Sequence, residues 1–314
     1  MRKTKRIFLF PGQGSQYPGM ALDFWDASDG VRSLFALASD INGVDMKALL
    51  AETDAETLKR ADVSQFAVTL ANLSAALFME ERGLSPDGVA GFSLGEYAAM
   101  AASGVVSTED CFRLVKARAG VMQATVDSIE GASFGAGMAA VIGLAPQTVT
   151  AFLAEWNIDG LFAANFNSNR QTVVSGTASA LVKAETLFTK NGAKRFVRLP
   201  VAGPFHSPLM QSASERFKIS LKDVLFNDPC IPLYSNVTGE RITSGAEAKR
   251  LALLHITSPV RWIDEEASII ADGFGAAFET GPGRTLAGLW KGMDVICRAA
   301  GTVHEILKIS SENY

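Results

Sequence analysis

The chain has 314 residues, of which 48% are apolar and 20% are charged, and its formal net charge is −4. This composition is typical of a globular protein with one large core, or with a large core and a small second domain. The weakly acidic balance argues against nonspecific binding to nucleic acid, because such binding needs a dense basic surface.

The cysteines and the N-terminus indicate the compartment. Cys111, Cys230 and Cys297 are scattered without CxxC spacing, which argues against a disulfide framework or a zinc site and favours a reducing environment. The basic start leads into the apolar run Ile7–Phe10, which Pro11 interrupts before it reaches the length of a signal peptide. We find no window of roughly 18 apolar residues that would cross a membrane. We therefore expect a cytoplasmic protein.

The beginning of the chain alternates strand and helix patterns. We predict a buried strand at Arg6–Phe10, followed by the glycine-rich loop Pro11–Gln16, and a second strand at Gly88–Phe92. Helices are predicted at about 65–82, from Leu94 onward and at about 108–123. This alternation predicts an α/β fold with a mainly parallel sheet.

The middle of the chain follows another order. We predict the series strand Met138–Gly143, helix Pro146–Trp156, strands Leu161–Asn165 and Gln171–Gly176, helix 178–191, and strand Lys194–Pro200. This β-α-β-β-α-β order is ferredoxin-like. We therefore predict a small domain over 132–200, inserted into a large domain formed by 1–131 and 201–314. Two further strands of the large domain are predicted, near Ile231–Ser235 and Ala276–Glu279.

A candidate nucleophile lies between the second predicted strand and the next helix. Gly91-Phe92-Ser93-Leu94-Gly95 matches GxSxG in the strand-turn-helix context that gives this motif its meaning. In such an elbow the helix N-terminus offers free N–H groups to developing negative charge. The structural alternative is a glycine-rich turn in which Ser93 only caps the helix.

A serine hydroxyl needs a base to become a good nucleophile, and the chain has three histidines. His304 lies near the C-terminus, and His255 ends a helical stretch, where a histidine commonly serves as a cap or core residue. His206 lies in the loop Val201–Pro208, which is rich in Gly and Pro and leaves a strand. A loop histidine is often structural, but beside a GxSxG elbow His206 is the best candidate for the base.

One arginine lies on the apolar side of its predicted helix. At about 100° per residue, Arg118 falls within the arc of apolar side chains, whereas Arg113 and Lys116 fall opposite. A buried guanidinium needs an anionic partner. That partner is either an internal carboxylate, such as Glu96, or the carboxylate of a bound substrate.

Together these motifs resemble one family along almost the whole chain: the malonyl-CoA:acyl carrier protein transacylases of fatty-acid and polyketide synthesis. The resemblance rests on Pro11–Gln16, Gly91–Glu96, Lys116–Gln123, Asn165–Ser168, His206, Ser258–Trp262 and Gly281–Gly288. It implies an α/β-hydrolase-like large domain with an inserted ferredoxin-like domain. It also implies an acyltransferase that carries malonyl from malonyl-CoA to the phosphopantetheine thiol of acyl carrier protein.

The resemblance also implies roles for individual residues. Ser93 becomes the nucleophile and His206 its base, oriented by the backbone carbonyl of His255. The remaining roles are an oxyanion hole formed by the backbone N–H groups of Gln13 and Leu94, and substrate contacts from Arg118, Asn167 and Phe205. The structural alternative for Asn167 is an asparagine that stabilises a turn. The implied scheme uses no metal or redox cofactor, and we expect a monomer.

Two positions next to the proposed catalytic residues bear on selectivity. The family usually has His before the nucleophile, where this chain has Phe92; chemistry should survive this change, but the polarity of the entrance should differ. Phe205 looks like the bulky residue associated with malonyl preference over methylmalonyl. One methyl group is worth only about 1–3 kcal/mol, so this selectivity need not be absolute.

Partners and rival functions complete the expectations. Carrier proteins are usually acidic, so docking needs a local basic patch, for which the candidates are Lys190, Lys194, Arg195 and Arg198. A solvated basic face is the structural alternative. The rival functions are a carboxylesterase, an inactive scaffold that binds carrier proteins, and a transacylase of a polyketide assembly line or a malonate decarboxylase complex.

Overall fold

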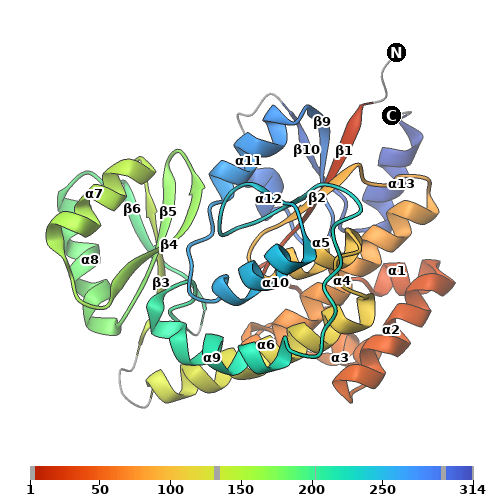
Figure 1. Cartoon of the computed structure of the whole chain (residues 1–314), viewed down its shortest axis with the longest axis horizontal. Coiled ribbons are helices and arrows are strands. Elements are labelled where there is room, and N and C mark those ends of the chain that lie inside the picture. Colours follow the sequence, from red (N-terminus) through yellow and green to blue (C-terminus); the bar gives the residue numbers. More distant parts are fainter. Residues whose placement is uncertain (1–3, 131–134, 202, 291–294, 313–314) are drawn as a thin grey trace.

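In the computed structural model, the described residues are 4–130, 135–201, 203–290 and 295–312. Their strands form two sheets, which Figure 1 shows in separate parts of the molecule. The larger sheet has the order β10-β9-β1-β2-β7-β8, and the smaller has the order β4-β5-β3-β6. The mixed α/β class with a mainly parallel sheet is therefore confirmed.

The six-stranded sheet is parallel except at one edge, where β8 runs antiparallel to β7. Its strands are β1 (Lys5–Phe10), β2 (Gly88–Gly91), β7 (Leu233–Tyr234), β8 (Arg241–Ile242), β9 (Phe274–Glu279) and β10 (Cys297–Ala299). β8 and β10 were not predicted from the sequence, because strands of two or three residues are too short to show a periodicity.

Both faces of this sheet are covered, as parallel sheets require. Along β1, Phe8 and Phe10 pack into the core under the helices α4 (Ala61–Glu81), α5 (Gly95–Ala102) and α6 (Thr108–Glu130). Ile7 and Leu9 point to the opposite face, into a second core with α11 (Trp262–Ala271) and α12 (Thr285–Leu289). A strand buried on both faces has a continuous apolar sequence, which is why β1 was predictable.

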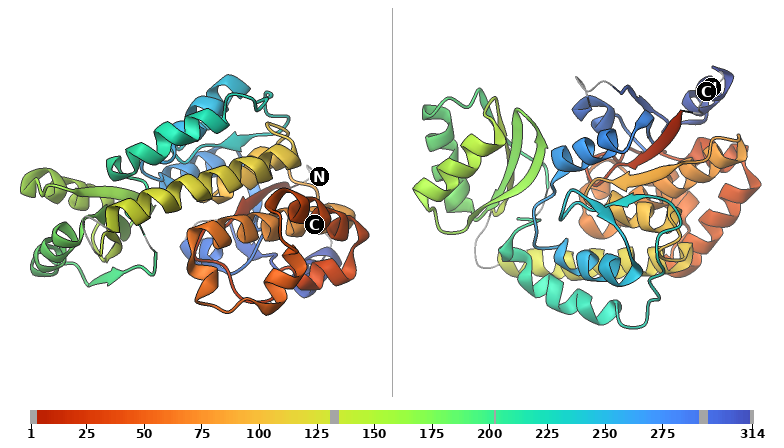
Figure 2. Two further views of the ribbon diagram at one scale, coloured as in Figure 1. Left: turned by 90° about the horizontal axis from the view of Figure 1, so that it is seen from below. Right: turned by 45° about the horizontal axis from the view of Figure 1, so that its top comes forward.

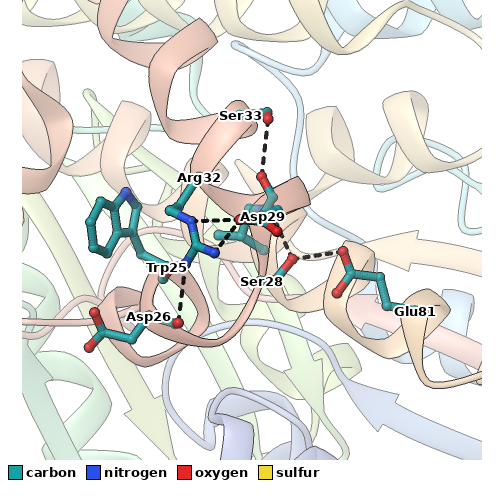
Figure 3. Close-up of polar contacts among 8 residues, drawn as sticks. Trp25, Asp26, Ser28, Asp29, Arg32, Ser33 and Glu81 are labelled. Carbon is teal, nitrogen blue, oxygen red and sulfur yellow. Dashed lines mark hydrogen bonds and ion pairs between the residues drawn. The ribbon is translucent and has the colours of Figure 1, made fainter.

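The other helices of this part are α1 (Leu22–Ala27), α2 (Asp29–Asn42), α3 (Met46–Glu52), η1 (Thr57–Lys59), η2 (Pro208–Met210), α9 (Gln211–Ser220), α10 (Gly245–Leu254) and α13 (Val303–Ser311). The corner between α1 and α2 is held by polar contacts, shown in Figure 3. Ser28 caps α2 by accepting from Val31 N and donates from Oγ to Glu81 in α4 at 2.7 Å. Arg32 donates to Asp29 and to the carbonyl of Trp25.

The four-stranded sheet follows the predicted β-α-β-β-α-β order. Its elements are β3 (Gly137–Ile142), α7 (Pro146–Trp156), β4 (Leu161–Ser168), β5 (Gln171–Gly176), α8 (Ala178–Lys190) and β6 (Arg195–Arg198), and all its strand pairs are antiparallel. Figures 1 and 2 show these elements as a lobe beside the large sheet. The predicted start of a small domain at 132 lies outside the described residues, and its end at 200 stays a prediction.

Two helices differ from the sequence expectation. α6 continues to Glu130, past the predicted end near 123. α4 has a mean hydropathy of 1.2 in its most apolar stretch, so that, in the described part of the chain, this one helix suits a membrane crossing by length and composition. The expectation that no window reaches this level was therefore wrong. The apolar character of α4 has another cause: α4 is a core helix, and 83% of its most apolar stretch is buried.

Candidate active site

The turn after β2 holds Ser93 in an unusual backbone conformation. Ser93 has φ 51°, in the left-handed region that non-glycine residues rarely adopt. The flanking glycines are required by contact: a Cβ on Gly91 would lie 2.1 Å from the carbonyl carbon of Gly95, and a Cβ on Gly95 would lie 1.9 Å from Phe10 O. The chain therefore turns sharply from β2 into α5, with Ser93 at its apex.

His206 reaches Ser93 from a distant part of the sequence. The distance from Ser93 Oγ to His206 Nε2 is 2.6 Å, and the His206 side chain is buried. His206 also has a left-handed backbone, with φ 56°. On its other side, His206 Nδ1 lies 3.0 Å from His255 O and 3.2 Å from Ser258 O. Because carbonyls only accept, Nδ1 carries the hydrogen and Nε2 is left to accept the proton of the Ser93 hydroxyl.

The environment of His206 keeps its ring uncharged. Burial, and then the positive charge of Arg118, lower the pKa of His206 from its ordinary value to about 4. The hydrogen bonds from Nδ1 to the two carbonyls oppose this shift but do not cancel it. The imidazole is thus neutral at physiological pH, which is the state that a general base requires.

The loop Pro11–Gln16 lies against the elbow. A Cβ on Gly12 would lie 2.5 Å from Phe92 O and 3.6 Å from Leu94 N, so only glycine allows this approach. Asn72 in α4 secures the loop by donating from Nδ2 to Pro11 O at 2.9 Å. Gln13, which follows Gly12 in this loop, lines the same cavity as Ser93 and Leu94. Among the described residues, the backbone N–H groups of Gln13 and Leu94 have no hydrogen-bond acceptor.

Arg118 is buried in the wall of this cavity. Its Nη1 donates to the side-chain amide of Gln65 at 2.5 Å, and the guanidinium lies 5.4 Å from the ring centroid of Tyr97. Its Nε has no hydrogen-bond partner in the part of the chain that is described. Arg118 forms no ion pair with Glu96 or with another described carboxylate. The internal salt bridge considered from the sequence is therefore not formed.

The cavity itself has a volume of about 220 Å³ and lies between the two sheets. Its apolar walls are formed by side chains from α6, β3, β5 and the segment that follows β6, namely Met122, Met138, Val173, Leu199 and Val201. Phe205 also lines it, as does Asn167, whose Oδ1 has no partner among the described residues. Phe92 lines it as well and packs edge-to-face on Trp262, with ring centroids 5.4 Å apart.

The structure therefore brings together most of the residues that the sequence singled out. Ser93, His206, Arg118, Asn167 and Phe205 line one cavity, together with Gln13, Leu94 and Phe92. His255 is buried behind His206 and contacts it through its carbonyl. His304 is exposed and does not line this cavity.

Several polar residues of the site were missed from the sequence, among them Gln65, Asn72 and Asn236. Gln65 and Asn72 lie on α4, and both are buried within an otherwise apolar helix. Buried polar side chains need partners, so their position on a core helix was a usable signal. Asn236 follows the two-residue strand β7, and nothing in its local sequence marks it.

The described residues contain no cluster of three His, Cys, Asp or Glu side chains placed to hold a metal ion. Cys111, Cys230 and Cys297 are free thiols at separate positions. The cavity brings together a hydroxyl, a neutral imidazole, a guanidinium and two backbone N–H groups that have no acceptor within the described chain. This set is typical of acyl transfer through a serine ester.

In serine-dependent acyl-transfer and hydrolytic enzymes, a serine typically follows one strand of a mainly parallel sheet, and a histidine from another part of the chain lies beside it. The acyl transferase domain family matches residues 7–291. The malonyl CoA-acyl carrier protein transacylase of Bacillus subtilis is 36% identical over 290 residues, which are 92% of this chain and 90% of that protein. The chain thus belongs to the acyl transferase family, among the malonyl CoA-acyl carrier protein transacylases.

Solved structures agree with this assignment. The malonyl CoA-acyl carrier protein transacylase from Coxiella burnetii is similar with a TM-score of 0.92 at 30% identity, over 98% of this chain and 97% of that one. A malonyl-transacylase in complex with its type II PKS acyl-carrier protein also has a TM-score of 0.92 and 30% identity, covering 99% of this chain and 100% of that one. The protein is therefore an acyltransferase with the two-sheet fold of this family.

The electrostatics of the site make a prediction about His206. Its imidazole should titrate near pH 4, and the substitution Arg118→Gln should raise this pKa, because a nearby positive charge disfavours the imidazolium. Histidine ring NMR over a pH series measures both values, and His206→Gln identifies the resonance. Arg113→Gln, on the exposed face of the same helix, serves as the control and should leave the pKa unchanged. A wild-type pKa near 6.5 would contradict the lowered pKa of His206.

Proposed function

We propose that the protein transfers a malonyl group from malonyl-CoA to the phosphopantetheine thiol of acyl carrier protein, and so supplies extender units for fatty-acid synthesis. One observation carries the proposal: Ser93 and His206 lie 2.6 Å apart in a cavity whose wall holds a buried Arg118 that no described carboxylate pairs with. A substrate with a thioester at one end and a carboxylate at the other complements both features. The names of the similar proteins support the same substrates.

In the first half-reaction, Ser93 Oγ attacks the thioester carbonyl while His206 Nε2 takes its proton. The N–H groups of Gln13 and Leu94 donate to the oxyanion of the tetrahedral intermediate, at the N-terminal end of α5. The intermediate collapses with cleavage of the C–S bond, and the imidazolium returns the proton to the leaving CoA thiolate. The products are a malonyl ester on Ser93 and free CoA.

The second half-reaction runs the same steps with another thiol. His206 takes the proton of the phosphopantetheine thiol, whose sulfur attacks the malonyl ester through the same oxyanion hole. The C–O bond to Ser93 breaks, and the His206 imidazolium returns the proton to the leaving Ser93 Oγ, which restores the hydroxyl. Proton transfer and charge stabilisation come from the chain itself, so the scheme uses no metal or redox cofactor.

We further propose that the protein acts as a monomer in the cytoplasm.

Residues of the cavity wall set the acyl preference in this scheme. The guanidinium of Arg118 binds the malonyl carboxylate, and Gln65 fixes its orientation through the hydrogen bond to Nη1. Asn167, with an unpartnered Oδ1 among the described residues, is available to bind a polar group of the substrate. Phe205 lies beside His206 and crowds the α-carbon of the acyl group, which disfavours an added methyl.

The second candidate function keeps the chemistry and changes the pathway. A transacylase that loads the carrier protein of a polyketide synthase would use the same nucleophile, base and arginine. The similarity to a malonyl-transacylase solved with a type II PKS acyl-carrier protein supports this alternative. Comparing kcat/KM for fatty-acid and polyketide carrier proteins separates the two pathways.

The nucleophile has a direct test. Wild-type protein incubated with malonyl-CoA should gain one malonyl group, read by intact mass, and Ser93→Ala should gain none because it lacks the attacking hydroxyl. Ser33→Ala, which removes an exposed hydroxyl on α2, is the matched control and should be acylated as wild type is. Adduct formation on Ser93→Ala would refute the scheme. Rapid turnover of p-nitrophenyl esters without transfer to a carrier protein would favour the carboxylesterase.

The role of Arg118 predicts a change in acyl selectivity. Arg118→Gln should lower kcat/KM for malonyl-CoA by about 100-fold, because a buried charge-assisted pair is worth about 2–5 kcal/mol. Acylation by acetyl-CoA, which has no carboxylate, should change by less than about 3-fold. Arg113→Gln, exposed on the same helix, should change neither rate. Equal losses for both acyl-CoAs would indicate a structural role for Arg118.

We also propose that the carrier protein docks on the four exposed basic residues near the end of the small lobe, Lys190, Lys194, Arg195 and Arg198. Arg198 directly precedes Leu199, which lines the cavity, so a partner bound there would lie close to the entrance.

Charge reversal tests this surface. Arg195→Glu with Arg198→Glu should raise the carrier-protein KM several-fold at low salt, because electrostatic attraction to an acidic partner is lost. The rate of Ser93 malonylation by malonyl-CoA should stay the same. Lys308→Glu, on α13, is the control. An unchanged KM would leave this patch as a solvated face.

A further inference from the structure

Asn236 lies directly behind the nucleophile elbow. It is fully buried and follows β7, the parallel neighbour of β2 in the large sheet. Because parallel strands end at the same edge of a sheet, the residues after β7 lie beside the residues after β2. The turn around Asn236 is itself closed by backbone hydrogen bonds between Ser235 and the residues Gly239 and Glu240.

The side-chain amide of Asn236 uses all of its hydrogen-bonding capacity. Oδ1 accepts from Ser93 N at 2.6 Å and lies 3.1 Å from His255 Nε2. Nδ2 donates to Gly91 O at 2.6 Å and to Glu265 Oε1 at 2.5 Å. Two donors and two acceptor directions are all that an amide has, so its orientation is determined from both ends.

These contacts hold the elbow on both sides of its apex. Gly91 O precedes the turn, and Ser93 N belongs to the residue whose φ is 51°. A non-glycine residue keeps such a backbone only when its surroundings over-determine it. Asn236 supplies this constraint, because relaxing φ at Ser93 would break or lengthen its short hydrogen bond to Asn236.

The same residue is linked to the segment that orients the base. His255, which contacts Asn236 through Nε2, accepts from His206 Nδ1 with its backbone carbonyl. Arg261 N donates to Asn236 O at 2.8 Å, in the segment that begins with Ser258. Asn236 N donates to Glu96 Oε2 at 2.7 Å, which connects it to the first turn of α5. One asparagine therefore joins the nucleophile, the base-orienting carbonyl and the helix after the elbow.

We propose that Asn236 is the positioning residue that keeps Ser93 in its left-handed conformation and couples the elbow to the segment that orients His206. The proposal rests on the proposed acyl transfer, because it assigns Asn236 a function in holding Ser93 Oγ within hydrogen-bonding distance of His206 Nε2. Asn236 does not contact the cavity, so it acts on the hydroxyl through the backbone and does not bind substrate.

The partners of Asn236 identify the sharpest substitution. In Asn236→Asp, one oxygen can still accept from Ser93 N, but the other replaces Nδ2 and faces Gly91 O, which cannot donate. It also faces the carboxyl of Glu265, whose single proton the two carboxyls would then have to share. The elbow then loses its upstream hydrogen bond while the volume of the side chain is preserved. Adding Glu265→Gln to the same protein offers an N–H donor to the newly introduced carboxylate and should recover part of the loss.

The experiment measures the first-turnover rate of Ser93 acylation by malonyl-CoA over a range of concentrations, using intact mass. Asn236→Asp should lower the maximal rate by about 10- to 100-fold, because small misplacement of reacting groups has effects of this size. The half-saturating malonyl-CoA concentration should change by less than about 3-fold. The double variant with Glu265→Gln should be faster than Asn236→Asp alone. The control is Tyr234→Phe in β7, the strand that precedes Asn236. It removes the 2.5 Å hydrogen bond from Tyr234 to Asp272 and should keep the wild-type rate.

A second variant covers the case in which Asn236→Asp does not fold. His255→Phe removes the Nε2 donor to Asn236 but keeps the backbone carbonyl that accepts from His206, and it should slow acylation several-fold. Melting temperatures identify the folded variants. Wild-type rates in folded Asn236→Asp, or in His255→Phe when the first variant is unfolded, would overturn the proposal. A change confined to the half-saturating concentration would overturn it as well.

A fluorophosphonate reagent separates this proposal from the proposed function. It modifies an activated serine whatever acyl group the enzyme prefers, so its rate with Ser93 should fall in Asn236→Asp in the same way. If wild-type protein reacts with the reagent but not with malonyl-CoA, the proposed substrate is wrong and the positioning role is still tested by the reagent. If both reagents modify Asn236→Asp at wild-type rates, the positioning role is wrong and the function stands.

Discussion

The tight turn at Ser93 is the constraint on which the rest of the site depends. Gly91 and Gly95 pack so closely that a single Cβ on either would overlap backbone atoms, and Gly95 also contacts the end of β1. β1, β2 and α5 therefore meet without intervening side chains. At this contact Ser93 has a left-handed backbone, its hydroxyl lies at the cavity, and Leu94 N has no acceptor among the described residues.

Burial determines the charge state of the groups around this turn. It lowers the pKa of His206 to about 4 and raises the pKa of Glu96 to about 8. It also raises the pKa of Glu265 far above its ordinary range, with the neighbouring Glu96 adding to the shift. The imidazole and the buried carboxyls are thus favoured in their neutral forms, whereas Arg118 keeps its charge. A cavity whose guanidinium has no carboxylate partner within the described chain is suited to an anionic acyl group.

The two sheets contribute different parts of the cavity. The large sheet supplies Ser93 after β2 and Gln13 after β1, and α6 supplies Arg118. The small sheet closes the opposite wall with side chains such as Met138 and Val173, and the segment after β6 leads back to Phe205 and His206. Both parts of the fold therefore contribute side chains to this cavity, which lies where the two parts meet.

The sequence by itself determined the local elements and the chemistry-bearing residues. A continuous apolar run predicted β1, GxSxG in a strand-turn-helix context indicated Ser93, and helical periodicity placed Arg118 on a buried face. Tertiary structure alone decided which groups meet. The small number of histidines and the family resemblance favoured His206 as the partner of Ser93, but only the fold brings the two side chains to 2.6 Å across 113 positions. Nothing in the sequence excludes Glu96 as the partner of Arg118 or shows that Asn236 bonds to both sides of the elbow. These pairings depend on strand order in the sheet, and local periodicity carries no information about strand order.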